Sequence, residues 1–137
     1  MLIALFTIMI LGGSATATLA YIADTQDSVK IVMVKDDRQK EALSTLKAMK
    51  KRTNARNKQV RRASKDIAKL LREENINTAD IDAIWTGYFA EIDQYNHDML
   101  DLRWELKEYI NREEWEAIFS GDWPFRIAKR RYFPVNK

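Results

Sequence analysis

The chain has 137 residues, no cysteine and a formal net charge of +3, and charged residues make up 31% of it. This length allows one small domain beside an apolar N-terminal segment, and the lack of cysteine excludes disulfides, thiolate metal sites and cysteine nucleophiles. With only four Gly and two Pro in the whole sequence, few residues can interrupt a helix, so we predict an all-α protein.

The N-terminal segment Met1–Ala23 contains no charged side chain. A helix of this length rises about 1.5 Å per residue, enough to cross a hydrocarbon core of roughly 30 Å. We therefore interpret residues 1–23 as a transmembrane anchor or uncleaved signal. Two alternatives stay open: a signal peptide cleaved after Ala17 or Ala20, and a buried helix. Since no Lys or Arg precedes the apolar run, we favour the retained anchor.

The same segment decides where the rest of the chain would lie. We expect a single-pass protein of the bacterial inner membrane with its soluble part in the periplasm; the alternative is secretion to the periplasm after cleavage. The basic residues that follow the span, from Lys30 to Lys40, would favour the opposite orientation by the positive-inside rule.

Residues 24–41 are predicted as a juxtamembrane connector, and a long helical hairpin with a capping helix is predicted for residues 42–122. In the first hairpin helix the apolar side is formed by Ala42, Leu46, Met49, Thr53, Val60, Ala63, Ile67 and Leu70. These steps of three, four and seven residues are typical of one buried stripe. The stretch Glu74–Asp82 then forms the turn, where Asn77 or Thr78 can cap the second helix.

The second hairpin helix carries the most regular pattern of the chain, and we predict it from about Thr78 to Ile110. Its apolar residues alternate in steps of four and three, as in the seam of a coiled coil; they are Ile81, Trp85, Tyr88, Ile92, Tyr95, Met99, Leu102, Leu106 and Tyr109. Asn111 and Glu114 form a capping-box pattern that begins a short helix. A basic aromatic tail, residues 123–137, follows.

Charge is segregated between the two hairpin helices. The stretch Lys47–Arg72 contains eleven Lys or Arg and one acid, whereas residues 73–122 contain three bases and fourteen acids. A short turn makes the two helices antiparallel neighbours. We therefore expect the basic helix to pack against the acidic one, with apolar burial as the driving force and charge selecting the partner.

The end of the second helix resembles a known family. Leu102-Arg103, Leu106, Asn111, Glu113-Glu114 and Trp115 are similar to the corresponding run of periplasmic helical-hairpin stress chaperones and heavy-metal sensors. The resemblance covers Met99–Phe119 and implies an exported, often dimeric α-hairpin that senses stress, binds metal or holds unfolded clients. The sensors use several His and Met ligands, whereas this chain has one His, so we predict no metal site and no cofactor.

One arrangement of possible metal ligands occurs nonetheless. His97 has Asp93 four residues before it and Asp101 four residues after it, so the three side chains share one face of the helix. Two carboxylates and one imidazole can hold a divalent ion. That face lies away from the seam, where solvated acids are ordinary, and we name these residues only as candidates.

Two groups of residues are candidates for binding a partner. Leu100 and Trp104 share a face outside the seam, which the short helix, the aromatic tail or another subunit could cover; the alternative is an exposed partner site, since exposed apolar patches usually bind other molecules. Trp123 and Phe125 lie in the aromatic tail. The second group is basic and consists of Lys50, Lys51, Arg61 and Arg62, which need not face the acidic helix. Such bases can bind an acidic partner.

No combination of nucleophile, base and acid indicates catalysis, so we predict a non-enzymatic, membrane-anchored interaction or scaffold protein, an accessory subunit of an envelope complex. Its partners would be proteins, including a second copy of itself, and membrane lipid around the N-terminal helix. A periplasmic chaperone-like or stress-sensing protein is the alternative. A membrane-tethered nucleic-acid binder is a third interpretation, which requires a cytoplasmic soluble part, and we predict no small-molecule substrate.

Overall fold

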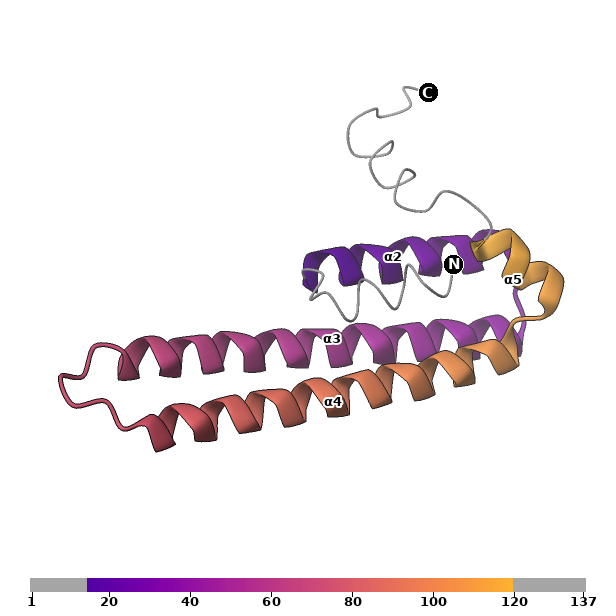
Figure 1. Ribbon diagram of the computed structural model, residues 1–137. Coiled ribbons are helices and arrows are strands. Elements are labelled where there is room, and N and C mark those ends of the chain that lie inside the picture. Colours follow the sequence, from indigo (N-terminus) through magenta and orange to yellow (C-terminus); the bar gives the residue numbers. More distant parts are fainter. Residues whose placement is uncertain (1–14, 120–137) are drawn as a thin grey trace, which may run out of the picture.

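The computed structural model describes residues 15–119, and every regular element within them is a helix. The helices are α2 (Ala15–Val32), α3 (Asp37–Leu70), α4 (Thr78–Tyr109) and α5 (Arg112–Phe119). Figure 1 shows α3 and α4 as a long hairpin, with α2 beside α3 and α5 folded back at the end of α4. The all-α class and the hairpin are therefore confirmed.

The N-terminal prediction has to be corrected in part. No helix in residues 15–119 is both long and apolar enough to be a candidate membrane span. Met1–Ser14 lies outside the described residues, while Ala15–Ala23 belongs to α2, whose Ile22 is buried. The expected connector, residues 24–41, is mostly helical: α2 continues to Val32, and α3 begins at Asp37 rather than at Ala42.

The turn between α2 and α3 is short and fixed by local hydrogen bonds. The carboxylate of Asp36 caps α3 by accepting from the backbone N–H of Gln39 at 3.0 Å. The Gln39 amide in turn donates to the Met33 carbonyl at 3.1 Å. Because polar groups at both helix ends are satisfied, α2 can reverse direction within four residues and pack against α3.

The second turn and α5 follow the predicted capping residues. Asn77 caps α4 by accepting from the N–H of Ala79 at 3.0 Å. At α5, the N–H of Glu114 donates to Asn111 Oδ1 at 2.8 Å, and the N–H of Asn111 donates to Glu114 Oε2 at 3.0 Å. The capping box is confirmed, and it ends α4 by starting a new helix three residues later.

The buried core lies in the half of the hairpin nearest to α5, where α2 and α5 cover it (Figure 1). Its apolar members are Ile22, Val29, Met33, Ala42, Leu46, Met49, Tyr95, Met99, Leu106, Ile110 and Ile118. We call the half with α2 the proximal half and residues 54–94 the distal half. In the distal half no residue is buried, because two helices alone cannot enclose side chains on all sides.

Arg38 ties the proximal end together. Its guanidinium donates to both carboxylate oxygens of Glu114 at 3.1 Å, and to the carbonyl oxygen of Tyr109 at 3.3 Å. The hydrogen bonds from Arg38 and from the N–H of Asn111 hold the pKa of the Glu114 carboxyl below its usual value. The first turn of α3 is thereby connected to the start of α5.

Candidate interaction surfaces

The basic helix packs beside α4 as predicted, but few of its charges form ion pairs with α4. Among residues 15–119, Arg52 is the one base of Lys47–Arg72 that forms ion pairs: with Asp98, and with Glu91 at 3.9 Å. The hydrogen bond from Arg52 lowers the pKa of Asp98. The helices are antiparallel neighbours as expected, but most of the bases project into solvent.

The four basic partner-binding candidates follow this pattern. Lys50, Lys51, Arg61 and Arg62 are all exposed on α3, and none forms an ion pair with a residue that the structure describes. Lys50 and Lys51 lie on the proximal half, Arg61 and Arg62 on the distal half. They form two separate positions along a basic surface rather than one site.

Tyr95 marks the point where the core ends. Its side chain is 2% exposed, and its hydroxyl lies 3.1 Å from that of Thr53. The Thr53 hydroxyl already donates to the Met49 carbonyl at 2.9 Å, so its single proton is used and the Tyr95 hydroxyl is the donor between them. The guanidinium groups of Arg56 and Arg52 lie 4.7 and 5.6 Å from the ring centroid.

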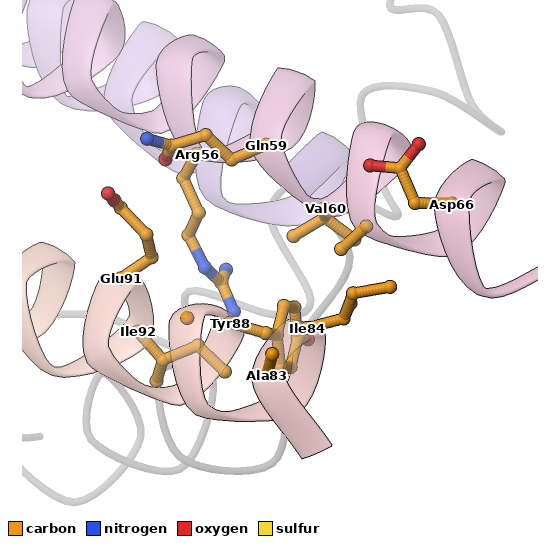
Figure 2. A pocket seen from close by; sticks show the side chains of 11 residues that line it. Arg56, Gln59, Val60, Asp66, Ala83, Ile84, Tyr88, Glu91 and Ile92 are labelled. Carbon is orange, nitrogen blue, oxygen red and sulfur yellow. The ribbon is translucent and has the colours of Figure 1, made fainter. Parts of the chain in front are cut away.

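A groove of about 230 Å³ opens between α3 and α4 just beyond Tyr95. Figure 2 shows the Arg56 side chain reaching from α3 toward α4, across the groove from Tyr88 and Ile92. Arg56 Nε and Gln59 Oε1 are buried without a hydrogen-bond partner among the described residues. A Cβ added at Gly87 would meet nothing within 4 Å, so part of the groove exists because this position has no side chain.

Large apolar side chains are exposed along α4. Trp104 and Phe89 are 57% and 59% exposed, and Trp85 and Leu100 are 42% and 39% exposed. At about 100° per residue, these four positions fall within an arc of roughly 100° on the helix surface. We call Trp85, Phe89, Leu100 and Trp104 the α4 stripe. It is about 30 Å long at the usual helical rise.

The two halves of the stripe differ in their surroundings. Trp85 stacks on Phe89 with ring centroids 5.9 Å apart, and both rings contact Tyr88 at less than 6 Å. Further along, Trp104 has the Lys107 ammonium 5.0 Å from its ring centroid. More than half of Trp104 is exposed, and among the described helices α5 packs mainly against α2.

The stripe corrects one sequence prediction and extends another. Trp85 was assigned to the buried seam, yet it is more exposed than the other eight seam residues, which are buried or half-buried. Leu100 and Trp104 lie outside the seam, as predicted, and both are exposed. Sequence reasoning missed Phe89 as their companion, although the spacing of 4, 11 and 4 residues from Trp85 to Trp104 places all four on one side.

The remaining candidates form no site in the described chain. Asp93, His97 and Asp101 are exposed on α4, and residues 15–119 contain no group of three or more His, Cys, Asp or Glu arranged to hold a metal ion. Trp123 and Phe125 lie outside the described residues.

Comparison with known proteins adds no relative: no protein-family model matches the chain, and no curated protein or solved structure matches it. The resemblance of Met99–Phe119 to helical-hairpin stress proteins therefore stays a sequence prediction.

Proposed function

We propose that this chain is a non-enzymatic interaction protein that binds a protein partner through the α4 stripe, as an accessory or scaffold subunit of an envelope complex. The α4 stripe is the observation that carries the proposal. Four large apolar side chains on one side of one helix leave considerable apolar surface in water. An amphipathic helix of a partner fits such a stripe, since its anchors recur every three or four residues.

The exposed bases of α3 supply a second contact. Lys50, Lys51, Arg61 and Arg62 lie on the helix adjacent to α4 and are free to meet acidic side chains. Charges at the rim of an interface mainly accelerate association and select the partner, whereas the buried aromatic side chains supply most of the affinity. We therefore expect the partner to combine an apolar helix face with acidic flanks.

The proposal is tested by purifying the tagged full-length chain in a mild detergent. Another protein is expected in a stoichiometric amount, and Trp104→Glu is expected to lose it by at least tenfold. Trp104 is exposed, so the substitution should leave the far-ultraviolet circular dichroism spectrum unchanged. Ser44→Glu, at an exposed position of α3, serves as the control. Recovery of the chain without any partner would contradict the proposal.

We further propose that the uncharged N-terminal segment anchors the chain in the bacterial inner membrane with α3, α4 and α5 in the periplasm; insertion of Met1–Ala23 requires the start of α2, which begins at Ala15 in the structure, to leave the bundle. The support is the lack of charge throughout Met1–Ala23. A periplasm-dependent reporter fused after Lys137 is expected to be active. Activity only of a cytoplasm-dependent reporter would contradict this placement and would make the bases of α3 available to nucleic acid.

A chaperone-like function is the second candidate, and the stacked pair Trp85–Phe89 favours it. Exposed aromatic rings flanked by charges of both signs can bind unfolded chains while the protein stays soluble. The full chain at several-fold excess would then suppress aggregation of a denatured client protein, and Phe89→Asp would suppress it less. The full chain is needed, because α2 begins at Ala15 and a cut at residue 24 would divide this helix.

A further inference from the structure

The α4 stripe lies on a helix at the edge of the described bundle. Figure 1 shows α3 between α4 and α2, and within residues 15–119 α4 packs mainly against α3. The four side chains of the stripe are 39–59% exposed. A further helix with an apolar stripe of similar length can therefore pack on α4 without displacing a described helix.

The spacing of the stripe is the same when it is read in either direction. Its members are separated by 4, 11 and 4 residues, from Trp85 through Phe89 and Leu100 to Trp104. When a second α4 runs antiparallel to the first about the middle of the stripe, Phe89 comes level with Leu100 of the second copy. Trp85 comes level with Trp104 of the second copy. A two-fold axis at the middle forms each contact twice, as in most dimers of identical chains.

The charges beside the stripe are balanced, although α4 as a whole is acidic. At about 100° per residue, the side of α4 that carries the stripe holds two acids and two bases; they are Asp82, Asp93, Arg103 and Lys107. The other six acids of Thr78–Tyr109 project from other sides of the helix. A second α4 can therefore approach the stripe without a net repulsion between like charges.

Charge also selects the antiparallel orientation. In that orientation Asp82 is level with Lys107 of the second copy, and both side chains lie near the middle of the arc that holds the stripe. In a parallel dimer each of these residues would face its own copy, and like charges would repel. Asp82 and Lys107 are exposed, and neither forms an ion pair with another residue of the described chain.

Polar side chains lie at the middle of this contact. Asp93 is level with Asn96 of the second copy, because the two residues are equally far from the middle of the stripe. The amide N–H of Asn96 is a suitable donor to a carboxylate. This hydrogen bond would offset the approach of the two Asp93 carboxylates, which lie about 4.5 Å apart along the helix axis.

We propose that the α4 stripe binds a second copy of this chain, α4 against α4 in antiparallel orientation, and that the two copies form a two-fold symmetric dimer. The inference rests on the proposed function, because it names a partner for the stripe. The second α4 supplies the amphipathic helix with acidic flanks that the stripe and the bases of α3 would recognise. The distal half of each copy then lies beside the proximal half of the other.

The size of the contact predicts a reversible dimer. At roughly 200 Å² for a large aromatic side chain, four half-exposed side chains remove about 400 Å² per copy from water. A standard interface buries roughly 800 Å² per partner. We therefore expect a dissociation constant in the micromolar range. A second copy bound this weakly can be displaced by the other protein of the proposed complex.

Reversing the pair of Asp82 and Lys107 tests the inference in the full-length chain, purified in a mild detergent and measured by sedimentation equilibrium. Asp82→Lys and Lys107→Asp are each expected to raise the dissociation constant of the dimer at least tenfold, since each turns two attractive pairs into two repulsive ones. The chain with both substitutions is expected to return to within about threefold of the unchanged chain. Asp101→Lys is the matched control, because it makes the same charge change at an exposed position of α4 outside the stripe's side.

Single cysteines test the orientation, because the chain has no natural cysteine. In the antiparallel dimer the two copies of residue 93 lie about 4.5 Å apart along the helix axis, and the two copies of residue 86 about 25 Å apart. Under a mild oxidant, Asp93→Cys is expected to form a disulfide between copies at least tenfold more than Thr86→Cys. In a parallel dimer both variants would form it, which would overturn the proposed orientation.

The outcomes separate this inference from the proposed function. A pure chain that stays monomeric, yet loses another protein on Trp104→Glu, would overturn the dimer and leave the proposed function intact. A dimer that weakens in both single variants, is restored in the double variant and is purified without another protein would support the inference and contradict the accessory role. Self-association that neither single variant changes would place the contact elsewhere on the chain and would overturn the inference.

Discussion

Tyr95 is the residue on which the end of the core depends. Its ring is buried, its hydroxyl donates to Thr53, and two arginines lie over the ring. Replacing it by phenylalanine removes only the hydroxyl and leaves the hydrogen bond from Thr53 to Met49. Tyr95→Phe is therefore expected to cost about 1 kcal/mol of unfolding free energy, and Tyr95→Ala about 3–5 kcal/mol through the cavity left behind.

Urea denaturation followed by circular dichroism measures both changes. Tyr88→Phe is a matched control, since Tyr88 is half-buried beyond the core and no hydrogen bond from its hydroxyl to another described residue occurs. Its cost should be close to zero. A Tyr95→Phe chain as stable as the unchanged one would mean that the hydroxyl pair contributes nothing.

Glu114 makes stability depend on pH at the proximal end. Hydrogen bonds from Arg38 and from the Asn111 N–H lower the pKa of this carboxyl in the folded chain. Stability from a lowered carboxyl pKa is present above the ordinary glutamate pKa of about 4.3 and is lost as pH falls through the folded pKa. Glu114→Gln keeps an oxygen for the capping box but removes the charge.

The melting temperature of Glu114→Gln is accordingly expected to lie below that of the unchanged chain at pH 7, and the difference should narrow as the pH is lowered below about 4. Thermal melts across this range provide the measurement. Glu116→Gln is the control: its pair with Arg112 has side chains 64% and 92% exposed, and such pairs contribute little. A pH-independent difference for Glu114→Gln would show that geometry, not charge, stabilises this end.

At the scale of the element, α4 combines a regular seam with one helix-breaking residue. Gly87 lies in the interior of α4, and a Cβ there would meet nothing within 4 Å. Gly87→Ala is therefore expected to raise the unfolding free energy by about 1 kcal/mol, the usual gain in helix propensity. Ala90→Gly, at an exposed position one turn later, should cost a similar amount.

Urea denaturation of the two variants tests whether Gly87 has a steric function. Equal and opposite changes would show that the groove tolerates a methyl group and that only propensity differs. A loss of stability in Gly87→Ala would instead indicate that some segment outside residues 15–119 packs closely against this glycine.

Helix type, capping and pairing could be read from the sequence because they depend on local signals. The seam from Ile81 to Tyr109, the cap at Asn77 and the capping box at Asn111 all recur in the structure. Trp85 could not be assigned correctly, because a seam position is buried only where enough helices meet. That depends on which helices cover the hairpin at each level, and the covering helix α2 includes Ala15–Ala23, a stretch whose composition also fits a membrane span.

The charge pattern also shows what could and could not be predicted from the sequence, here for the candidate surfaces. Opposite net charges correctly indicated that α3 and α4 are neighbours. They could not indicate that Arg52 alone would form ion pairs between α3 and α4. Ion pairing depends on the distance and direction of the individual side chains that face each other along the two helices. Exposed pairs contribute at most about 1 kcal/mol, so apolar packing, rather than charge, determines which faces meet.

The whole molecule is a hairpin with two unequal halves. Within residues 15–119, α2, α3, α4 and α5 share one core in the proximal half, whereas the distal half consists of α3 and α4 without a buried residue (Figure 1). Local opening is easiest where few apolar contacts are lost and backbone hydrogen bonds face solvent. The distal half should therefore open without the proximal half, and Tyr95 with Thr53 should form the boundary.

Hydrogen exchange followed by mass spectrometry tests this division in the full chain held in lipid vesicles. Amides of α3 and α4 within residues 54–94 are expected to exchange at least tenfold faster than amides of the same two helices in the proximal half. A tenfold difference corresponds to about 1.4 kcal/mol in the free energy of opening. Uniform exchange along both helices would mean that the hairpin opens as one unit.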